Sequence, residues 1–453
     1  MKHVIKTCCA FLLVAVMCLS LFACTPSNNP EITVPPETVI VPEGNVKFTC
    51  DISSLSEEDA ANAFIEAFEK KYPDVSVTKD YSPGNIPARI ASGEIGDVFH
   101  FTEEETYNYA VTQKSLLSLN QYIQPLKIDT SAVYTGVYAL GEVEGQLYMV
   151  PRDYNHIIMV YSRTALKEAG LADPKDDWTW EDFKSYCTQL TKTDASDANL
   201  YTQVGGNLNY GWDPVYVSFL EGWGGKWVDT EEKVINLTDE KVRAGIEELL
   251  NFAKTGAIKP EGSSDMSRYE KVTDDKYVFR TMVYPQIVSI GQNYDNLNID
   301  WDFVSFPSLP THKVGTGCSG FGVYRYTKNP NAAAALALFF LDKDGQTAYH
   351  QSVGGSVPLV KELADSDFWR YADSEGTEND WSKKNFDAFV SFPEADTAGR
   401  VKCKMPVKVA AVVAGGWSGM LSSFFDNGNY IDKLKETETT ANETWQRILK
   451  SAS

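Results

Sequence analysis

Residues 141–192 constrain the fold most, because their hydrophobic period changes twice. Alternating apolar residues first predict a half-exposed strand that ends at Pro151, and the apolar run 157–160 then predicts a fully buried strand. Helical periodicity follows until Gly170, and a second helix is expected after Thr179, whose side chain can cap its first turn. The stretch therefore predicts a surface hairpin that becomes a buried strand and delivers the chain to a new group of helices.

Residues 46–101 alternate between strand and helix patterns. Strands are expected at 46–51, 75–77 and 93–101, with a helix at 58–71. This order predicts an α/β fold with a mostly parallel sheet, in which ligands bind beyond the carboxyl ends of the strands. We therefore expect Phe101 and Glu103 or Glu104 at the rim of a ligand cleft. A solvated acidic helix N-terminus explains any one of these glutamates equally well.

The N-terminus has the features of a secretory leader. Residues 1–23 combine a basic start with a short apolar core. The small residue before Cys24 matches a bacterial lipobox, which predicts cleavage after Ala23 and a lipid on the Cys24 sulfur. An ordinary signal peptide with an incidental cysteine is the alternative. Residues 24–44 contain five prolines and no aromatic residue, and they predict a disordered tether between the membrane and a globular body.

The formal charge of −21 limits the classes of partner. An acidic surface disfavours nucleic acid and electrostatic docking on anionic lipid. It suits a soluble protein outside the cell that binds a neutral ligand. The same charge keeps a cationic ligand, such as a polyamine, as an alternative.

Three tryptophans lie within sixteen residues: Trp212, Trp223 and Trp227. Glycine turns separate them, so no single helical face accounts for the group. Sugars offer apolar C–H faces that stack on flat rings and hydroxyls that need planar polar partners. The cluster predicts at least one ring that faces a ligand, although core packing explains each tryptophan alone equally well.

The order of these segments carries a family resemblance. Residues 141–192 resemble the first lobe-to-lobe crossover of extracellular solute-binding proteins of ABC importers. The resemblance rests on the order of a hairpin, the polar tetrad 152–155, a crossing strand, a helix that ends in EAGL and the sequence TWEDF. The likeness is greatest to the carbohydrate-binding branch that includes maltose-binding protein. It implies a two-lobe, type II periplasmic-binding-protein-like fold with three crossovers, in which lobe 1 comprises 45–157 and 306–362, and lobe 2 comprises 158–305 and 363–453.

The resemblance also implies a function and a site. It places aromatic rings in the cleft at Tyr284 and Trp417, and it implies that ligand draws the lobes together before a membrane permease receives it. We expect a monomer that needs no cofactor and is anchored by lipid to the outer face of the cell membrane. The expected ligand contacts come from Phe101, Glu103, Glu104, Asp153, Tyr154, Trp212, Trp223, Tyr284 and Trp417.

No catalytic signature stands out. The five histidines show no close metal-ligand spacing, and there is no CxxC motif. Residues 315–320 satisfy GxGxxG but precede a strand-like segment, which disfavours a phosphate cradle. Residues 416–420 miss the GxSxG pattern at Met420. A surface glycoside hydrolase or lyase stays an alternative, because a carboxylate pair is invisible in sequence. A peptide or polyamine carrier and a non-transport adhesin are further alternatives.

Four cysteines remain beyond the leader and the lipid site. Pairing within lobes would join Cys50 to Cys318 and Cys187 to Cys403. Buried free thiols are an equal alternative.

Overall fold

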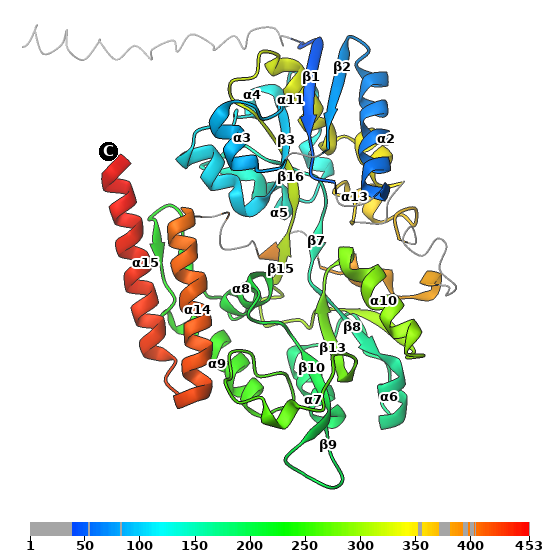
Figure 1. Cartoon of the computed structure of the whole chain (residues 1–453), viewed down its shortest axis with the longest axis vertical. Coiled ribbons are helices and arrows are strands. Elements are labelled where there is room, and N and C mark those ends of the chain that lie inside the picture. The colour runs from blue at the N-terminus through cyan, green and yellow to red at the C-terminus, as the bar shows by residue number, and fades with distance from the viewer. Residues whose placement is uncertain are drawn as a thin grey trace, which may run out of the picture. The chain divides into compact units, whose positions relative to one another are not determined.

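The computed structural model describes residues 39–52, 55–81, 84–351, 356–370, 381–392, 397–398, 403 and 405–452. The predicted leader, the lipid site at Cys24 and most of the tether lie outside the described residues. The unit Ile40–Ser453 contains both lobes (Figure 1).

Lobe 1 is built on a sheet with the order β2-β1-β3-β16-β6. β1 (Gly44–Thr49) is parallel to β2 (Val75–Asp80) and β3 (Val98–Thr102), and β16 (Ser319–Val323) is antiparallel to β3 and to β6 (Val150–Pro151). The helix α2 (Leu55–Lys71) buries Phe64, which stacks on Phe340 with ring centres 3.8 Å apart. The first two strands confirm the predicted pattern. β3 begins later than expected, because Gly93 ends helix α3 (Ile86–Ser92) in a left-handed conformation.

Lobe 2 is built on a second sheet with the order β14-β8-β13-β10-β9. β8 (Ile158–Ser162) runs antiparallel to β14 (Trp301–Ser305) and to β13 (Tyr277–Met282), whereas β10 (Tyr201–Asn207) is parallel to β13. β8 is buried along its whole length, as its apolar run predicts. The helices α7 (Trp180–Leu190), α8 (Asp213–Gly222) and α9 (Glu240–Lys254) contribute to the core on this side. Thr179 and Asp182 form the predicted cap of α7.

Three short strands, here called the hinge strands, lie between the two sheets, and two of them, β7 and β15, connect the lobes. They form a sheet with the order β17 (Thr397–Ala398), β15 (Val314–Gly317) and β7 (Asn155–His156). β7 leads into β8 of lobe 2, and β15 leads into β16 of lobe 1. This arrangement agrees with the crossover predicted at residues 141–192.

The lobe boundaries remain a prediction, but side-chain packing moves one of them. Lobe 1 is expected to resume at residue 306. Instead, beyond β14 of the lobe 2 sheet, Phe306 and Val314 lie in the core of lobe 2. The return is made by β15 and β16, whose glycine-rich sequence carries little apolar signal.

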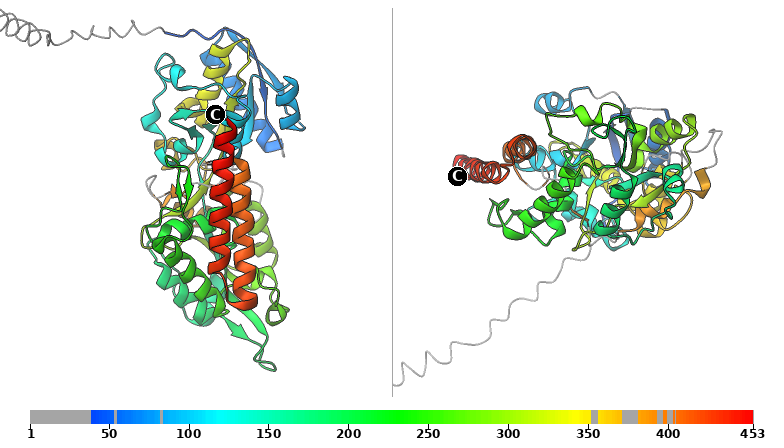
Figure 2. Two further views of the ribbon diagram at one scale, coloured as in Figure 1. Left: turned by 90° about the vertical axis from the view of Figure 1, so that its left-hand side faces the viewer. Right: turned by 90° about the horizontal axis from the view of Figure 1, so that it is seen from below.

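The C-terminal helices α14 (Val407–Asn427) and α15 (Ile431–Ala452) lie side by side (Figures 1 and 2). By length and composition α14 is the one described helix that could cross a membrane. Its side chains Val409, Val413 and Met420 are buried in the lobe 2 core.

The four cysteines Cys50, Cys187, Cys318 and Cys403 are buried, and none of them forms a disulfide. The alternative of free thiols is therefore the correct one, and the within-lobe disulfides are absent. At Cys187 the backbone lies so close to β10 that a Cβ at Gly205 would come within 2.2 Å of its Cα.

The remaining elements are shorter or lie outside the sheets that position the site. They are α4 (Asn120–Ile123), α5 (Thr135–Tyr138), β4 (Glu142–Val143), β5 (Gln146–Leu147), α6 (Arg163–Ala169), β9 (Lys192–Thr193), β11 (Val228–Asp229), β12 (Val234–Ile235), α10 (Ile287–Asn296), α11 (Pro330–Leu338), α12 (Lys343–His350) and α13 (Lys361–Ala364).

Candidate ligand site at the hinge strands

A cavity of about 210 Å³, here called the hinge pocket, lies where both lobes meet the hinge strands. Lobe 1 lines it from the end of β3, from the turn after β6 and from the start of β16. Lobe 2 lines it from the start of α8 and from the turn after β13. The lining residues are Thr102, Arg152, Asp153, Asn155, Trp212, Pro214, Val283, Pro285, Gly317, Cys318 and Ser319.

Local sequence explains why these segments converge. β3 and β13 both end at the pocket, and the carboxyl ends of strands are where an α/β fold leaves room for a ligand. Pro214 lies in the first turn of α8, where its missing N–H has no cost, and Trp212 immediately precedes the helix. Gly315 permits this approach, because a Cβ there would lie 1.7 Å from the carbonyl oxygen of Pro214. The GxGxxG motif thus serves close packing at the hinge.

The polar side of the pocket is centred on an ion pair. Nε and Nη2 of Arg152 each lie 3.0 Å from Oδ2 of Asp153. The second oxygen, Oδ1 of Asp153, is buried without a hydrogen-bond partner, as are Oδ1 of Asn155 and Oγ of Ser319. A buried polar atom left unpaired costs about 1–3 kcal/mol. Three residues that line the pocket therefore each carry a buried oxygen that lacks a partner in this arrangement of the lobes.

The charges that line the pocket balance each other. Burial lowers the pKa of Arg152, but Tyr349 and Asp153 raise it more, so that the net shift is upward and the guanidinium stays charged. Burial, reinforced by Arg152, lowers the pKa of the nearby His100 to about 3, so this imidazole is neutral. Among the lining residues only Arg152 and Asp153 carry charge, and the pocket is therefore neutral as a whole.

The structure brings two of the predicted contact residues together. Asp153 and the half-buried Trp212 both line the hinge pocket. Glu104 is half-buried but does not line it, and Phe101 is buried against Tyr109 with ring centres 5.3 Å apart. Glu103 is buried as well, and its Oε2 accepts a hydrogen bond of 3.1 Å from the backbone N–H of Cys318. This carboxylate ties β3 to β16.

The other predicted aromatic residues do not line the hinge pocket. Tyr284 and Trp417 are buried and donate to the backbone carbonyl oxygens of Trp369 at 2.8 Å and of Tyr210 at 2.9 Å, respectively. The buried hydroxyl of Tyr154 lies 2.7 Å from Nδ1 of His156 and 3.2 Å from the carbonyl oxygen of Phe392. Their polar atoms are thus satisfied within the protein, which lets the rings fill the core. Trp223 is half-buried and lines a different depression, beside Trp180 and Glu248.

Sequence reasoning missed Arg152, Asn155 and Ser319 as candidate contacts. The first two could have been found, because they flank Asp153 in the polar tetrad that interrupts an apolar region. Ser319 lies inside the GxGxxG motif, and no local signal distinguishes its side chain.

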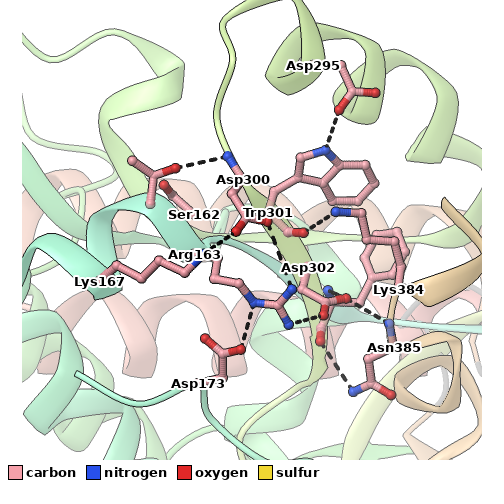
Figure 3. Close-up of polar contacts among 12 residues, drawn as sticks. Ser162, Arg163, Lys167, Asp173, Asp295, Asp300, Trp301, Asp302, Lys384 and Asn385 are labelled. Atoms are coloured by element: carbon pink, nitrogen blue, oxygen red, sulfur yellow. Dashed lines mark hydrogen bonds and ion pairs between the residues drawn. The ribbon is translucent and has the colours of Figure 1, made fainter. Parts of the chain in front are cut away.

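A second polar cluster lies beside β14 and is fully paired (Figure 3). Arg163 contacts Asp302 at 2.5 Å and Asp173 at 2.6 Å. The backbone N–H of Asn385 donates to Asp302 at 2.7 Å, and the Lys384 ammonium lies 4.2 Å from the ring centre of Trp301. These contacts hold residues 381–392 against β14, so the cluster has a structural role. Among the described residues no group of histidine, cysteine or carboxylate side chains could hold a metal ion.

Two sheets joined by hinge strands, with a pocket where both meet, define the class of two-lobe solute-binding proteins. A family model described as bacterial extracellular solute-binding protein matches residues 63–375. The chain belongs to this family, which confirms the family predicted from the crossover.

Individual relatives agree with this assignment. A galactooligosaccharide-binding protein of Bacillus subtilis is 24% identical over 381 residues, which are 79% of this chain and 82% of the relative. The solved sugar-binding protein MalE of Xanthomonas citri has a TM-score of 0.67 at 15% identity and covers 89% of this chain and 98% of its own. An ABC substrate-binding protein of Listeria monocytogenes, solved in complex with cycloalternan, has a TM-score of 0.64 at 15% identity and covers 89% and 99%. The structural likenesses confirm the two-lobe α/β fold.

Proposed function

We propose that this protein captures a neutral oligosaccharide in the hinge pocket and delivers it to the permease of an ABC transporter. The observation that carries the proposal is the set of three buried, unpartnered oxygens, on Asp153, Asn155 and Ser319, in the same pocket as Trp212. Sugar hydroxyls donate to such oxygens, and a sugar ring stacks on indole. The names of the Bacillus and Listeria proteins support a saccharide as the ligand class.

The two sides of the pocket have different roles. The polar side belongs to lobe 1 and the hinge strands, whereas Trp212, Val283 and Pro285 belong to lobe 2. A sugar makes both sets of contacts only when the lobes are together, so it stabilises the closed arrangement. The cavity is smaller than the ~300–1,000 Å³ of pockets that bury drug-sized ligands. The pocket therefore takes one end of a saccharide, and a longer ligand requires a wider opening.

The proposal includes location and anchoring. The family is extracellular, and a lipid on Cys24 would hold the body at the outer face of the membrane, with residues 24–44 as the tether. A monomer suffices, because both sides of the pocket come from one chain. The protein binds its ligand without chemical change.

Isothermal titration calorimetry with a panel of oligosaccharides tests the proposal. Trp212→Ala and Asp153→Asn are expected to weaken binding at least about tenfold, or about 1.4 kcal/mol. Trp223→Ala is the matched control, since it removes a half-buried indole outside the hinge pocket. Equal affinities of Trp212→Ala and the unmodified protein would contradict the site. Breakdown of the sugar during a long incubation would instead favour the glycoside hydrolase alternative.

A further inference from the structure

A second and larger cavity, of about 800 Å³, lies against the β4–β5 hairpin and is here called the hairpin pocket. Lobe 1 lines it from Tyr107 and residues 139–145. Lobe 2 lines it from Glu221, from residues 225–228, 230, 231 and 233, from Cys403 and from Trp445 on α15. It shares no lining residue with the hinge pocket.

Trp445 stands out among the buried tryptophans. In the described part of the chain seven others are buried, and the indole N–H of each donates to an acceptor: Trp178, Trp180, Trp227, Trp301, Trp369, Trp381 and Trp417. Trp445 is 1% exposed, yet its Nε1 has no partner. An indole N–H in such a place costs free energy unless an acceptor reaches it. Trp445 lines the hairpin pocket, where a ligand that reached the indole N–H would supply the acceptor.

A complementary acceptor lines the same pocket. The carboxylate of Glu142 is half-buried and forms no ion pair or hydrogen bond with any described residue. Burial raises its pKa, as expected for a carboxylate that has lost water and gained no partner. The two lysines of the lining are already engaged, Lys226 with Asp229 at 2.7 Å and Lys233 with Glu144 at 3.5 Å.

These two groups restrict the chemistry of the occupant. An anion is disfavoured, because Glu142, Glu144 and Glu231 line the pocket. An ammonium group could pair with Glu142 but could not accept a hydrogen bond from Trp445. A hydroxyl group both donates and accepts, so neighbouring hydroxyls of one molecule can serve both residues.

We infer that the hairpin pocket is a second binding site, for a neutral polyhydroxylated molecule such as a sugar. Its hydroxyls donate to the Glu142 carboxylate and accept from the indole N–H of Trp445. The inference does not require the hinge pocket to bind sugar. The lining comes from both lobes, and the Glu144–Lys233 ion pair joins the lobes at the pocket. An occupant that contacts both lobes therefore changes the free energy of one lobe arrangement relative to another.

Nuclear magnetic resonance of the indole N–H groups tests this site directly. The ¹⁵N-labelled protein has ten tryptophans, and Trp445→Phe and Trp212→Phe assign the two signals of interest. Galactose and maltotriose, titrated into the millimolar range, are the probes. We expect a saturable shift of the Trp445 signal that persists in Trp212→Ala, which separates the hairpin pocket from the hinge pocket.

Matched carboxylate variants complete the experiment. Glu142→Gln is expected to weaken the Trp445 response at least about tenfold, whereas Glu232→Gln, which makes the same change outside the lining, leaves it unaltered. If Glu142→Gln does not fold, Trp445→Phe serves instead. This variant should lose the part of the sugar-induced rise in melting temperature that Trp212→Ala retains. A Trp445 signal that neither sugar moves, that moves only with putrescine, or whose response disappears in Trp212→Ala overturns the inference. A shift of the Trp212 signal alone would support the proposed function and reject the second site.

Discussion

The indole N–H of Trp417 donates to the carbonyl oxygen of Tyr210 at 2.9 Å, and the ring of Tyr216 stacks on Trp417 with centres 4.6 Å apart. The hydrogen bond connects α14 to the loop that precedes α8, and the stacked rings connect α14 to α8 itself. Trp417 is therefore a core residue, although the family resemblance assigned it to ligand stacking.

Trp417→Ala should lower the free energy of unfolding by about 3–5 kcal/mol, since it leaves a large cavity in the lobe 2 core. Trp417→Phe should cost less, because only the hydrogen bond to Tyr210 and part of the ring are lost. Urea unfolding followed by circular dichroism gives both values. The affinity for sugar should stay near that of the unmodified protein in Trp417→Phe, and a tenfold loss there would return this residue to the binding site.

The Arg152–Asp153 ion pair makes a prediction that separates stability from binding. The two side chains are only 14% and 3% exposed. Asp153→Ala should destabilise the fold by about 3–5 kcal/mol, because it leaves a buried guanidinium without its partner. The double variant Arg152→Met, Asp153→Leu should recover part of this loss in urea unfolding. It should still fail to bind sugar by calorimetry. A double variant less stable than Asp153→Ala would argue against an electrostatic cause.

Buried histidines predict a loss of stability in mild acid. Burial lowers the pKa of His156 to about 4, opposed by its hydrogen bond to the carbonyl oxygen of Ala388, and it lowers the pKa of His350 to about 3. In the unfolded chain both titrate near 6.5. Below that pH the unfolded state therefore binds more protons, and stability is lost as pH falls from 6.5 towards the folded-state values.

The expected slope is about 1.4 kcal/mol per pH unit for each histidine. Urea unfolding at several pH values between about 7 and 5 measures it. His156→Gln should reduce the slope by about 1.4 kcal/mol per pH unit, which is the contribution of one histidine. A slope that the substitution leaves unchanged would show that other groups cause the acid sensitivity.

The free thiols make a chemical prediction. Burial raises the pKa of Cys50 to about 12 and raises the pKa of Cys187 well above its ordinary value. Both thiols are thus protonated and shielded, which suppresses alkylation. Iodoacetamide without reductant should modify Cys50 and Cys187 only after denaturation, as shown by peptide mass mapping. Recovery of a disulfide-linked peptide from this set would contradict the structure.

Much of the fold could be predicted from sequence. The alternation of periods at residues 46–101 and 141–192 identified β1, β2, α2, β8 and the capped start of α7, because hydrophobic periodicity and capping are local properties of the chain. The second return to lobe 1 runs through β15, whose glycines carry a weaker local signal than the apolar run of β14.

The candidate site was less accessible to sequence reasoning. Asp153 was found because it interrupts an apolar pattern, and Trp212 because it belongs to a tryptophan cluster, yet their common pocket depends on contacts between segments about sixty residues apart. An indole or phenol has the same local signature whether it faces a ligand or the core. For Tyr284 and Trp417 the difference was made by distant carbonyl oxygens that satisfy their polar atoms.

By itself, then, the sequence determined the strands and helices, the first crossover and the family, since these follow from the spacing of apolar residues along the chain. Only the tertiary structure decided which polar atoms are buried without a partner. That property depends on every neighbour in space, and the residues that share it include Asp153, Asn155 and Ser319 in one pocket and Trp445 beside another.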